Sequence, residues 1–272
     1  MPYNERMNPA CKRARVNTRT ALVALAIGVL LMVVNLAACS QQSGSTSSAT
    51  REVKEATSSA SSASSASGSS ATPKPDAENA LACIGDSITF GSGIDHPERD
   101  AWPALLQEKL GASWHVANLG MPGAMLLNES SSPYRSTGYV ERALDLDPSV
   151  AIIMLGTNDS ADPSWNADSY HAQLEALVDE ITQASTRNVQ IVLMAPPCTF
   201  FSKDNVWHRD PTNSLIGNEI RSIVKQVAAD KGTRYLDLFA FTENHPEWFP
   251  DELHPDETGN QAIADYIYEQ VF

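Results

Sequence analysis

Positive charge is scarce in this chain of 272 residues. Lys and Arg number 19 against 33 Asp and Glu, which gives a formal net charge of −14 at pH 7. A surface of this sign does not favour nucleic acid and would repel anionic lipid head groups, so we expect no nucleic-acid partner. The simplest explanation of such a charge is that it keeps the protein soluble.

Cysteine and metal-binding patterns are scarce as well. Of four cysteines, Cys11 and Cys39 fall in the N-terminal region. Only Cys83 and Cys198 remain for the rest of the chain, in or just after apolar segments where a free cysteine is often a small buried hydrophobe, although an exported protein could join them by a disulfide. The histidines form no HxH or HExxH spacing, so we expect no metal site and no other cofactor.

The first 38 residues have the layout of a secretory signal. A basic stretch precedes an uncharged apolar run, residues 21–34, and Leu36-Ala37-Ala38-Cys39 follows. This tetrad resembles a bacterial lipobox, so we expect residues 1–38 to be a signal peptide and Cys39 to be lipidated. An uncleaved transmembrane anchor is the alternative, because the run is close to the shortest length that spans a bilayer. Both interpretations predict an exported protein tethered to a bacterial membrane.

Residues 39–79 are dominated by Ser, Ala and Thr. Their apolar content is too low to close a core, so we predict a disordered spacer. The charged patch at 51–55 could form a helical turn, but its Ser-rich flanks do not support one. Residues 80–272 remain, a suitable length for one domain with a sizeable core.

Short apolar runs alternate with longer amphipathic segments in residues 80–272. The strands that we expect are 81–84, 114–118, 150–155, 189–194 and 235–238. The expected helices are 101–110, 140–144, 169–185, 214–231 and 259–270. This alternation predicts an α/β fold with a parallel sheet covered by helices on both sides.

One polar motif comes after each of the first three strands, and a fourth lies in the loop that follows the last strand. They are Gly85-Asp86-Ser87, Asn118-Leu119-Gly120-Met121-Pro122-Gly123, Gly156-Thr157-Asn158-Asp159 and Asp251-Glu252-Leu253-His254. Ligands of parallel sheets bind outside the carboxyl ends of the strands, so we expect the four motifs to converge there.

The residue types in these motifs suggest nucleophilic catalysis. The hydroxyl of Ser87 is a weak nucleophile unless a base such as His254 takes its proton, and a carboxylate such as Asp251 can orient that base. The spacing of three residues predicts that Asp251 and His254 share one side of a helical turn. Asp86 is better explained as a residue that braces its loop.

The four motifs together resemble those of the SGNH hydrolases of the GDSL esterase/lipase family. This resemblance implies an α/β, three-layer flavodoxin-like sandwich with a central, mostly parallel five-stranded sheet. It implies Ser87 as nucleophile, His254 as base and Asp251 as acid. The oxyanion hole would consist of the backbone N–H groups of Ser87 and Gly123 and the side chain of Asn158.

Two of these assignments have competitors. Gly120 competes with Gly123, although the family spacing from the motif's asparagine favours the later glycine. Without the other motifs, Asn158-Asp159 would be interpreted as a turn closed by an Asx hydrogen bond. The sequence also excludes an α/β-hydrolase, because the residue two positions after Ser87 is Thr89 rather than the second glycine of G-x-S-x-G.

The natural ester is less well defined. Family members cleave acetyl groups from sugars, acyl chains from lipids, and thioesters. The 154–160 and 249–255 segments look more like those of bacterial carbohydrate esterases, and four aromatic residues could stack on a sugar or simply fill the core: Trp165, Phe200, Phe201 and Trp207.

We therefore expect an extracytoplasmic serine esterase that removes small acyl groups, acetyl foremost, from a glycan or small-molecule ester through an acyl-enzyme. A lipase, lysophospholipase or thioesterase of the same family is the alternative. A glycan-binding lipoprotein without catalytic activity is a third possibility, which an intact set of motifs disfavours.

Overall fold

The computed structural model describes residues 77–201 and 212–272. The expected signal peptide, the lipidation site Cys39, nearly all of the expected spacer, and Trp207 lie outside the described residues, so the predictions about them stay predictions. Within the described ranges, no helix is both long enough and apolar enough to cross a membrane.

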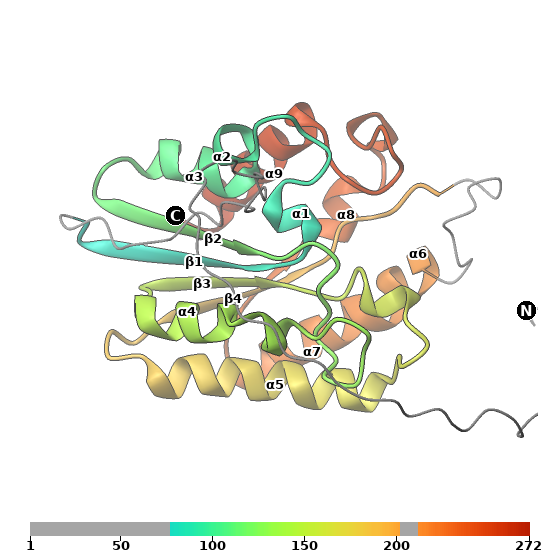
Figure 1. Cartoon of the computed structure of the whole chain (residues 1–272), viewed down its shortest axis with the longest axis horizontal. Helices are drawn as coiled ribbons and strands as arrows, with labels where there is room; N and C mark the ends of the chain where they lie inside the picture. The colour runs from blue at the N-terminus through green and yellow to red at the C-terminus, as the bar shows by residue number, and fades with distance from the viewer. Residues whose placement is uncertain (1–76, 202–211) are drawn as a thin grey trace, which may run out of the picture. The chain divides into compact units, whose positions relative to one another are not determined.

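A five-stranded sheet forms the centre of the domain (Figure 1). Its strands are β1 (Asn79–Gly85), β2 (Trp114–Gly120), β3 (Val150–Met154), β4 (Gln190–Ala195) and β5 (Arg234–Asp237). Their order is β2-β1-β3-β4-β5, and every neighbouring pair is parallel. This is the flavodoxin-like order, so the expected α/β architecture is confirmed. All five residues of β3 are buried, as expected for a strand covered on both faces.

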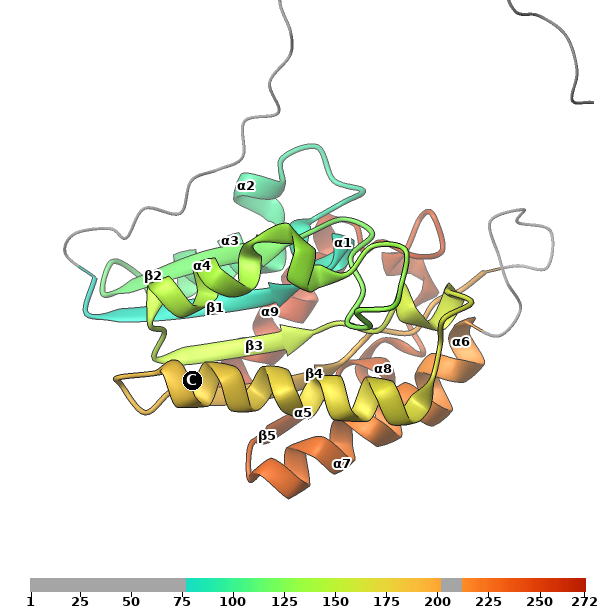
Figure 2. The same cartoon turned by 60° about the horizontal axis from the view of Figure 1, so that its bottom comes forward.

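Helices cover both faces of the sheet. The α-helices of the described residues are α1 (Ser87–Phe90), α2 (Pro97–Asp100), α3 (Trp102–Leu110), α4 (Tyr139–Leu146), α5 (Ala167–Ala184), α6 (Thr212–Leu215), α7 (Arg221–Lys231), α8 (Leu238–Thr242) and α9 (Glu257–Val271). Figure 1 shows α2, α3 and α9 on one side of the sheet and α4, α5 and α7 on the other. In Figure 2, α5 lies along the sheet between α4 and α7, consistent with the contacts of both with α5.

The sheet divides the apolar interior into two cores, and alternate residues of β1 point into one core or the other. Leu81 and Cys83 pack in the core beneath α3 and α9, whereas Ala82 and Ile84 pack in the core that includes α5. This is the two-residue period of a strand, whose side chains point to opposite faces. Cys198 belongs to the second core, and both Cys83 and Cys198 are buried free thiols. The disulfide that the sequence left open is therefore not formed.

Three details differ from the sequence prediction. The helix expected at 214–231 is divided, because a π-helical turn at Ile216–Ile220 separates α6 from α7. Residue Leu238, expected in the last strand, instead begins α8, whose N-cap Asp237 accepts a hydrogen bond from the Ala240 N–H. The four-residue helices α1 and α2 were not anticipated, because so short a segment shows no helical period.

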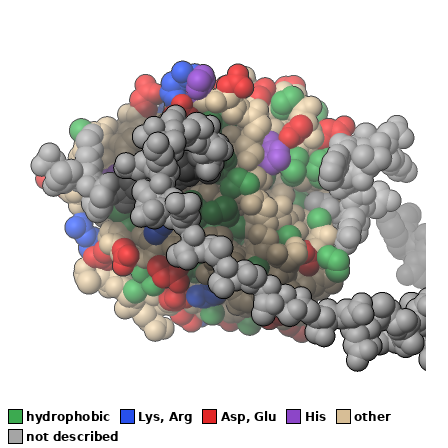
Figure 3. All heavy atoms as spheres, in the orientation of Figure 1, with side chains coloured by type: hydrophobic (Ala, Val, Ile, Leu, Met, Phe, Trp, Pro, Cys, Tyr) green, Lys and Arg blue, Asp and Glu red, His purple; other side chains and the backbone are tan. Residues whose placement is uncertain are grey.

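The buried side chain of Asn260 ties α9 to the rest of the domain. Its Oδ1 accepts a hydrogen bond from the Trp102 N–H at the start of α3, at 3.0 Å. Its Nδ2 donates to the carbonyl of Pro255 at 2.9 Å, just before α9 begins. One side chain therefore joins α3, α9 and the segment that leads into α9. On the outside, Figure 3 shows many Asp and Glu side chains and few Lys and Arg, in line with the net charge of −14.

Candidate active site

Four polar segments meet at the carboxyl end of the sheet. Ser87 follows β1, Gly123 follows β2 and Asn158 follows β3. The pair Asp251 and His254 lies in the loop between α8 and α9, after β5. This is the edge at which parallel α/β sheets bind their ligands.

Hydrogen bonds connect Ser87, His254 and Asp251 in series. His254 Nε2 lies 3.0 Å from Ser87 Oγ, and His254 Nδ1 lies 2.6 Å from Asp251 Oδ2. The serine is nearly buried at 8% exposure, whereas the Asp251 side chain is 50% exposed. The three side chains predicted to act as nucleophile, base and orienting acid are thus brought into the arrangement that a serine hydrolase requires.

The turn around Ser87 is fixed by its neighbour Asp86. The Asp86 carboxylate is fully buried and caps α1 by accepting a hydrogen bond from the Ile88 N–H at 3.0 Å. Burial raises the pKa of Asp86 to about 6, although the bond from Ile88 opposes that rise. Ser87 is the first residue of α1, and the N–H groups of a first helical turn have no acceptor within the helix. Asp86 therefore braces the loop, as the sequence predicted, while the Ser87 N–H has no acceptor within α1.

Asp251 and His254 form a tight turn rather than the helical turn that their spacing predicted. Glu252 between them has φ +68°, in the left-handed region that residues other than glycine rarely adopt. Asp251 Oδ1 accepts hydrogen bonds from the N–H groups of Leu253 and His254 at 3.0 and 2.6 Å. Burial acts to raise the pKa of Asp251, but hydrogen bonds from the backbone and side chain of His254 outweigh it and lower that pKa. The carboxylate therefore stays ionised beside the imidazole.

A glycine leaves room for this turn, and a backbone hydrogen bond anchors it. Gly93 has φ +96°, and a Cβ there would stand 3.0 Å from the Cβ of His254, so a side chain would press on the base. On the other flank, the Phe200 N–H donates to the Glu252 carbonyl at 2.8 Å. Two parts of the chain remote in sequence therefore fit the histidine: Gly93 leaves space beside it, and Phe200 anchors its turn.

The segment after β2 distinguishes the two candidate glycines of the oxyanion hole. The Gly120 N–H already donates to Asn118 Oδ1 at 2.9 Å, and a Cβ at Gly120 would lie 2.2 Å from the Phe90 nitrogen. Gly120 therefore serves the close packing of β2 on α1. Gly123 has φ +77° and lies in the turn that the Ala124 N–H closes onto the Met121 carbonyl at 3.0 Å. This geometry favours Gly123 as the amide donor.

Asn158, in the loop after β3, lies against the segment that contains Gly123. Its Nδ2 donates to the Ala124 carbonyl at 3.0 Å, so the side chain bridges two loops instead of closing an Asx turn of its own. An amide nitrogen carries two protons, and this bond uses one of them. The second proton remains for an oxygen that develops negative charge near Gly123.

Of the aromatic residues considered as sugar platforms, two pack inward. The Trp165 ring stacks at a tilt on Tyr170, and the Phe200 ring packs on Phe249, each with centroids 5.2 Å apart. Phe90 is an aromatic residue that the sequence analysis missed. It is 41% exposed and lies three residues after Ser87 in α1, so the two side chains fall on neighbouring positions of one turn. The spacing was visible in the sequence, but the four-residue helix was not.

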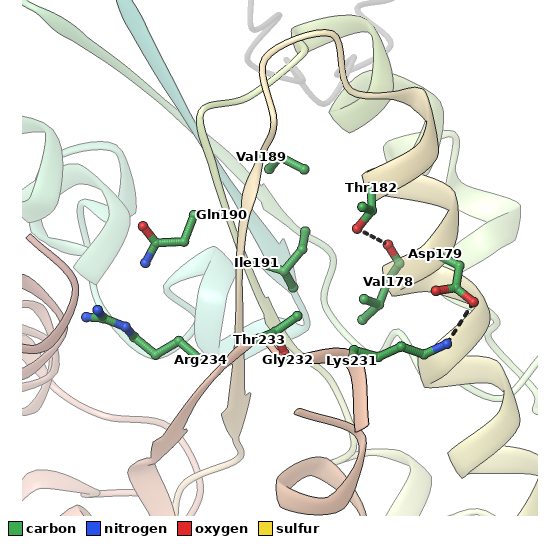
Figure 4. A pocket seen from close by; sticks show the side chains of 10 residues that line it. All are labelled: Val178, Asp179, Thr182, Val189, Gln190, Ile191, Lys231, Gly232, Thr233 and Arg234. Atoms are coloured by element: carbon green, nitrogen blue, oxygen red, sulfur yellow. Dashed lines mark hydrogen bonds and ion pairs between the residues drawn. The ribbon is translucent and has the colours of Figure 1, made fainter. Parts of the chain in front are cut away.

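A separate pocket lies at the opposite end of the sheet, where β4 and β5 begin (Figure 4). It has a volume of about 250 Å³. Gln190 and Arg234, the first residues of those strands, line it together with residues of α5 and α7. Lys231 Nζ and Asp179 Oδ2 form an ion pair at 2.8 Å in its wall. This pocket contains no member of the hydrogen-bonded series and is distinct from the candidate site.

Comparison with known proteins agrees with the geometry. Residues 83–262 match the GDSL-like lipase/acylhydrolase family. An acetylxylan esterase of Xylanibacter ruminicola is 32% identical over 213 residues, which cover 72% of this chain and 43% of the relative. The chain therefore matches less than half the length of that curated relative.

Solved structures share the fold. An acetylxylan esterase from Geobacillus stearothermophilus is 24% identical, with a TM-score of 0.54 over 72% of this chain and 95% of its own. A carbohydrate acetylesterase family member from Sinorhizobium meliloti is 19% identical, with a TM-score of 0.58 over 71% of this chain and 97% of its own.

Proposed function

The chain belongs to the GDSL-like lipase/acylhydrolase family, and from this premise we propose that it is a serine esterase that removes small acyl groups, acetyl foremost, from carbohydrate. The observation that carries the proposal is the continuous hydrogen-bonded series from Ser87 Oγ through the His254 ring to Asp251, at 3.0 and 2.6 Å. A serine has no structural need for such a base, whereas acyl transfer depends on one.

The first half of the reaction forms an acyl-enzyme. With its Nδ1 proton directed to Asp251, the imidazole of His254 offers the lone pair on Nε2 to the Ser87 proton. As that proton moves, Ser87 Oγ bonds to the ester carbonyl carbon and the carbonyl electrons move onto its oxygen. When the tetrahedral intermediate collapses, the alcohol leaves with the proton that His254 returns to it.

The second half repeats the cycle with water. His254 takes a proton from water as the water oxygen attacks the acyl carbon, and then protonates Ser87 Oγ as the carboxylic acid departs. In both halves the negative oxygen would be met by the N–H groups of Ser87 and Gly123 and by Asn158. Such donors act strongly because they are fixed before the charge develops.

Carbohydrate acetyl esters are supported as substrates by two observations. The 32% identical relative is an acetylxylan esterase, although this chain matches 43% of its length. The exposed ring of Phe90 stands three residues from the nucleophile, where an aromatic surface could stack on a sugar.

The decisive experiment is hydrolysis of p-nitrophenyl esters of increasing acyl length, followed by acetate release from acetylated xylan. We expect preference for acetyl, and loss of at least about 10³-fold in kcat for Ser87→Ala. Ser136→Ala, which removes an exposed serine hydroxyl on another loop, serves as the matched control. A preference for long chains would replace this proposal with a lipase, and full activity in Ser87→Ala would refute the assignment of the nucleophile.

We further propose that the protein is exported and tethered to a membrane by a lipid on Cys39. Support comes from the basic stretch, apolar run and Leu-Ala-Ala-Cys tetrad near the N-terminus. The test is mass spectrometry of the mature N-terminus in a bacterial host, with Cys39→Ser as control. An N-terminus upstream of residue 39 that carries no lipid would overturn the proposal.

A further inference from the structure

Asp159, the residue directly after Asn158, is a fully buried carboxylate that the reaction scheme above does not use. Its Oδ1 accepts a hydrogen bond from the Leu127 N–H at 2.9 Å, and its Oδ2 accepts one from the Leu126 N–H at 3.1 Å. Burial raises the pKa of Asp159 to about 6, while these two bonds oppose the rise. Burying a carboxylate is costly, so its two bonds to one segment call for an explanation.

The segment that Asp159 holds, residues 121–127, is the one that contains Gly123. At its beginning, the Met121 N–H donates to the Gly85 carbonyl at 3.0 Å, two residues before Ser87. In its middle, the Ala124 carbonyl accepts from Asn158 Nδ2 at 3.0 Å. At its end, the N–H groups of Leu126 and Leu127 donate the two hydrogen bonds to Asp159. Gly123 therefore lies between an anchor on the nucleophile loop and an anchor on the Asn158 loop.

A carboxylate suits this clamp better than any neutral side chain. Two adjacent N–H groups require two acceptor oxygens, and Asp in its ionised form presents only acceptors. Asparagine would satisfy one N–H and turn its own N–H₂ group toward the other. Because Asn158 and Asp159 are consecutive, the same short turn of backbone fixes the side-chain donor and the loop that carries the backbone donor.

We propose that Asp159 is a positioning residue for the oxyanion hole, which sets the Gly123 N–H relative to Asn158 through its grip on residues 126 and 127. The inference rests on the proposed function, because it assumes that Gly123 and Asn158 stabilise the negative oxygen. Loss of the clamp should weaken interactions formed in the transition state more than those formed with the bound ester, so kcat should fall while KM stays nearly constant.

The test compares Asp159→Asn with Asp162→Asn in the full chain, with p-nitrophenyl acetate as substrate. Asp162 is the matched control, because its carboxylate also joins this loop to the segment before α4, by accepting from Ser131 Oγ at 2.9 Å. Kinetics are normalised to the folded active fraction, titrated with an organophosphate that modifies Ser87. We expect about a 10- to 100-fold fall in kcat for Asp159→Asn, below the loss typical of deleting an oxyanion donor outright, and less than about a 2-fold change for Asp162→Asn.

A double-mutant cycle with Asn158→Ala separates positioning from a general structural role. If Asp159 acts through the oxyanion hole, Asp159→Asn should cost much less in the Asn158→Ala background than in the wild type. Losses that multiply independently, or a folded Asp159→Asn variant with wild-type kcat, would overturn the proposal. Should Asp159→Asn fail to fold, Asp159→Ser, which keeps one acceptor in a smaller side chain, is measured in the same cycle. Failure of the proposed function is a different result, namely an inactive wild type or an active Ser87→Ala variant.

Discussion

The two ends of the sheet differ in how their charged side chains are buried and paired. At the carboxyl end, the buried carboxylates of Asp86 and Asp159 accept hydrogen bonds from backbone N–H groups. At the amino end, the pocket of about 250 Å³ has its wall charges Lys231 and Asp179 paired with each other. The two buried carboxylates and this pocket therefore lie at opposite ends of the sheet.

This contrast shows what identifies a candidate site in this fold. Buried charge persists only where the surrounding structure holds it, and ionisable groups with strongly shifted pKa values concentrate at functional sites. In the pocket at the amino end, Lys231 and Asp179 are partly exposed and paired with each other, so they carry no such cost. If the contrast is functional, changes at the carboxyl end should alter turnover or the pH dependence of stability, and changes at the amino end should alter neither.

The largest effect should come from His254→Ala. Without the base, Ser87 keeps its proton, and kcat should fall by at least about 10³-fold with little change in melting temperature. Asp251→Asn should cost about 10- to 100-fold less than His254→Ala, because the half-exposed Asp251 orients the base and water can partly replace it. Steady-state kinetics of both variants check the ranking. A greater loss for Asp251→Asn than for His254→Ala would contradict it.

The next largest effect concerns stability and pH at Asp86. Its folded-state pKa of about 6 exceeds the usual value of 3.8, so the folded protein holds a proton that the unfolded chain has lost between these values. Ionisation of Asp86 therefore costs stability as pH rises from 4 toward 7, by about 3 kcal/mol at most. Asp86→Asn keeps an acceptor for the Ile88 N–H and removes this cost.

The measurement is the free energy of urea unfolding of Asp86→Asn minus that of the wild type, from pH 4.5 to 7.5. We expect this difference to rise with pH. Asp162→Asn is the control, because hydrogen bonds from Ser164 lower the pKa of Asp162 to about 2, and its ionisation is complete throughout this range. A flat difference for Asp86→Asn would show that its carboxylate is not destabilised by burial.

A smaller effect should distinguish sugar esters from simple ones at Phe90. Loss of a stacking surface worth about 1 kcal/mol should raise KM for an acetylated xylo-oligosaccharide by about 5- to 10-fold in Phe90→Ala. Turnover of p-nitrophenyl acetate should stay within about 2-fold. Tyr268→Ala, which removes an exposed aromatic ring of α9, is the matched control. Equal changes in KM for both substrates would remove Phe90 from sugar recognition.

The smallest effect should appear at the amino end. Lys231→Met breaks the ion pairs with Asp179 and Glu175, whose side chains are 47% and 33% exposed, so the loss of stability should be below about 1 kcal/mol. Both kcat and KM should equal those of the wild type. A fall in kcat of more than about 3-fold would show that the two ends of the sheet are coupled, and the contrast between them would fail.

Prediction from sequence succeeded where the pattern was local. Strands buried on both faces appear as short apolar runs, so 150–155 predicted β3 within one residue. The motifs likewise predicted which residues meet, because the carboxyl ends of parallel strands share one edge. Their chemical roles stay predictions until the variants are measured.

Prediction failed where a distant part of the chain decides the conformation. The spacing of Asp251 and His254 suggested a helical turn, but Glu252 adopts a positive φ with its carbonyl bound to the Phe200 N–H. The clamp from Asp159 to residues 126 and 127 likewise depends on contacts across more than 30 positions of sequence. Neither contact leaves a periodic trace, so neither could be read from the sequence.

The tie that Asn260 makes between α3 and α9 bears on when the site becomes complete during folding. Ser87 and His254 are separated by 167 positions, and the base is carried on the segment that Asn260 fastens to the start of α3. Contacts so distant in sequence form slowly, because the intervening chain must be ordered first. Esterase activity should therefore appear only at the last stage of refolding, when α9 docks, and local opening of α9 would extinguish it while the sheet is still intact.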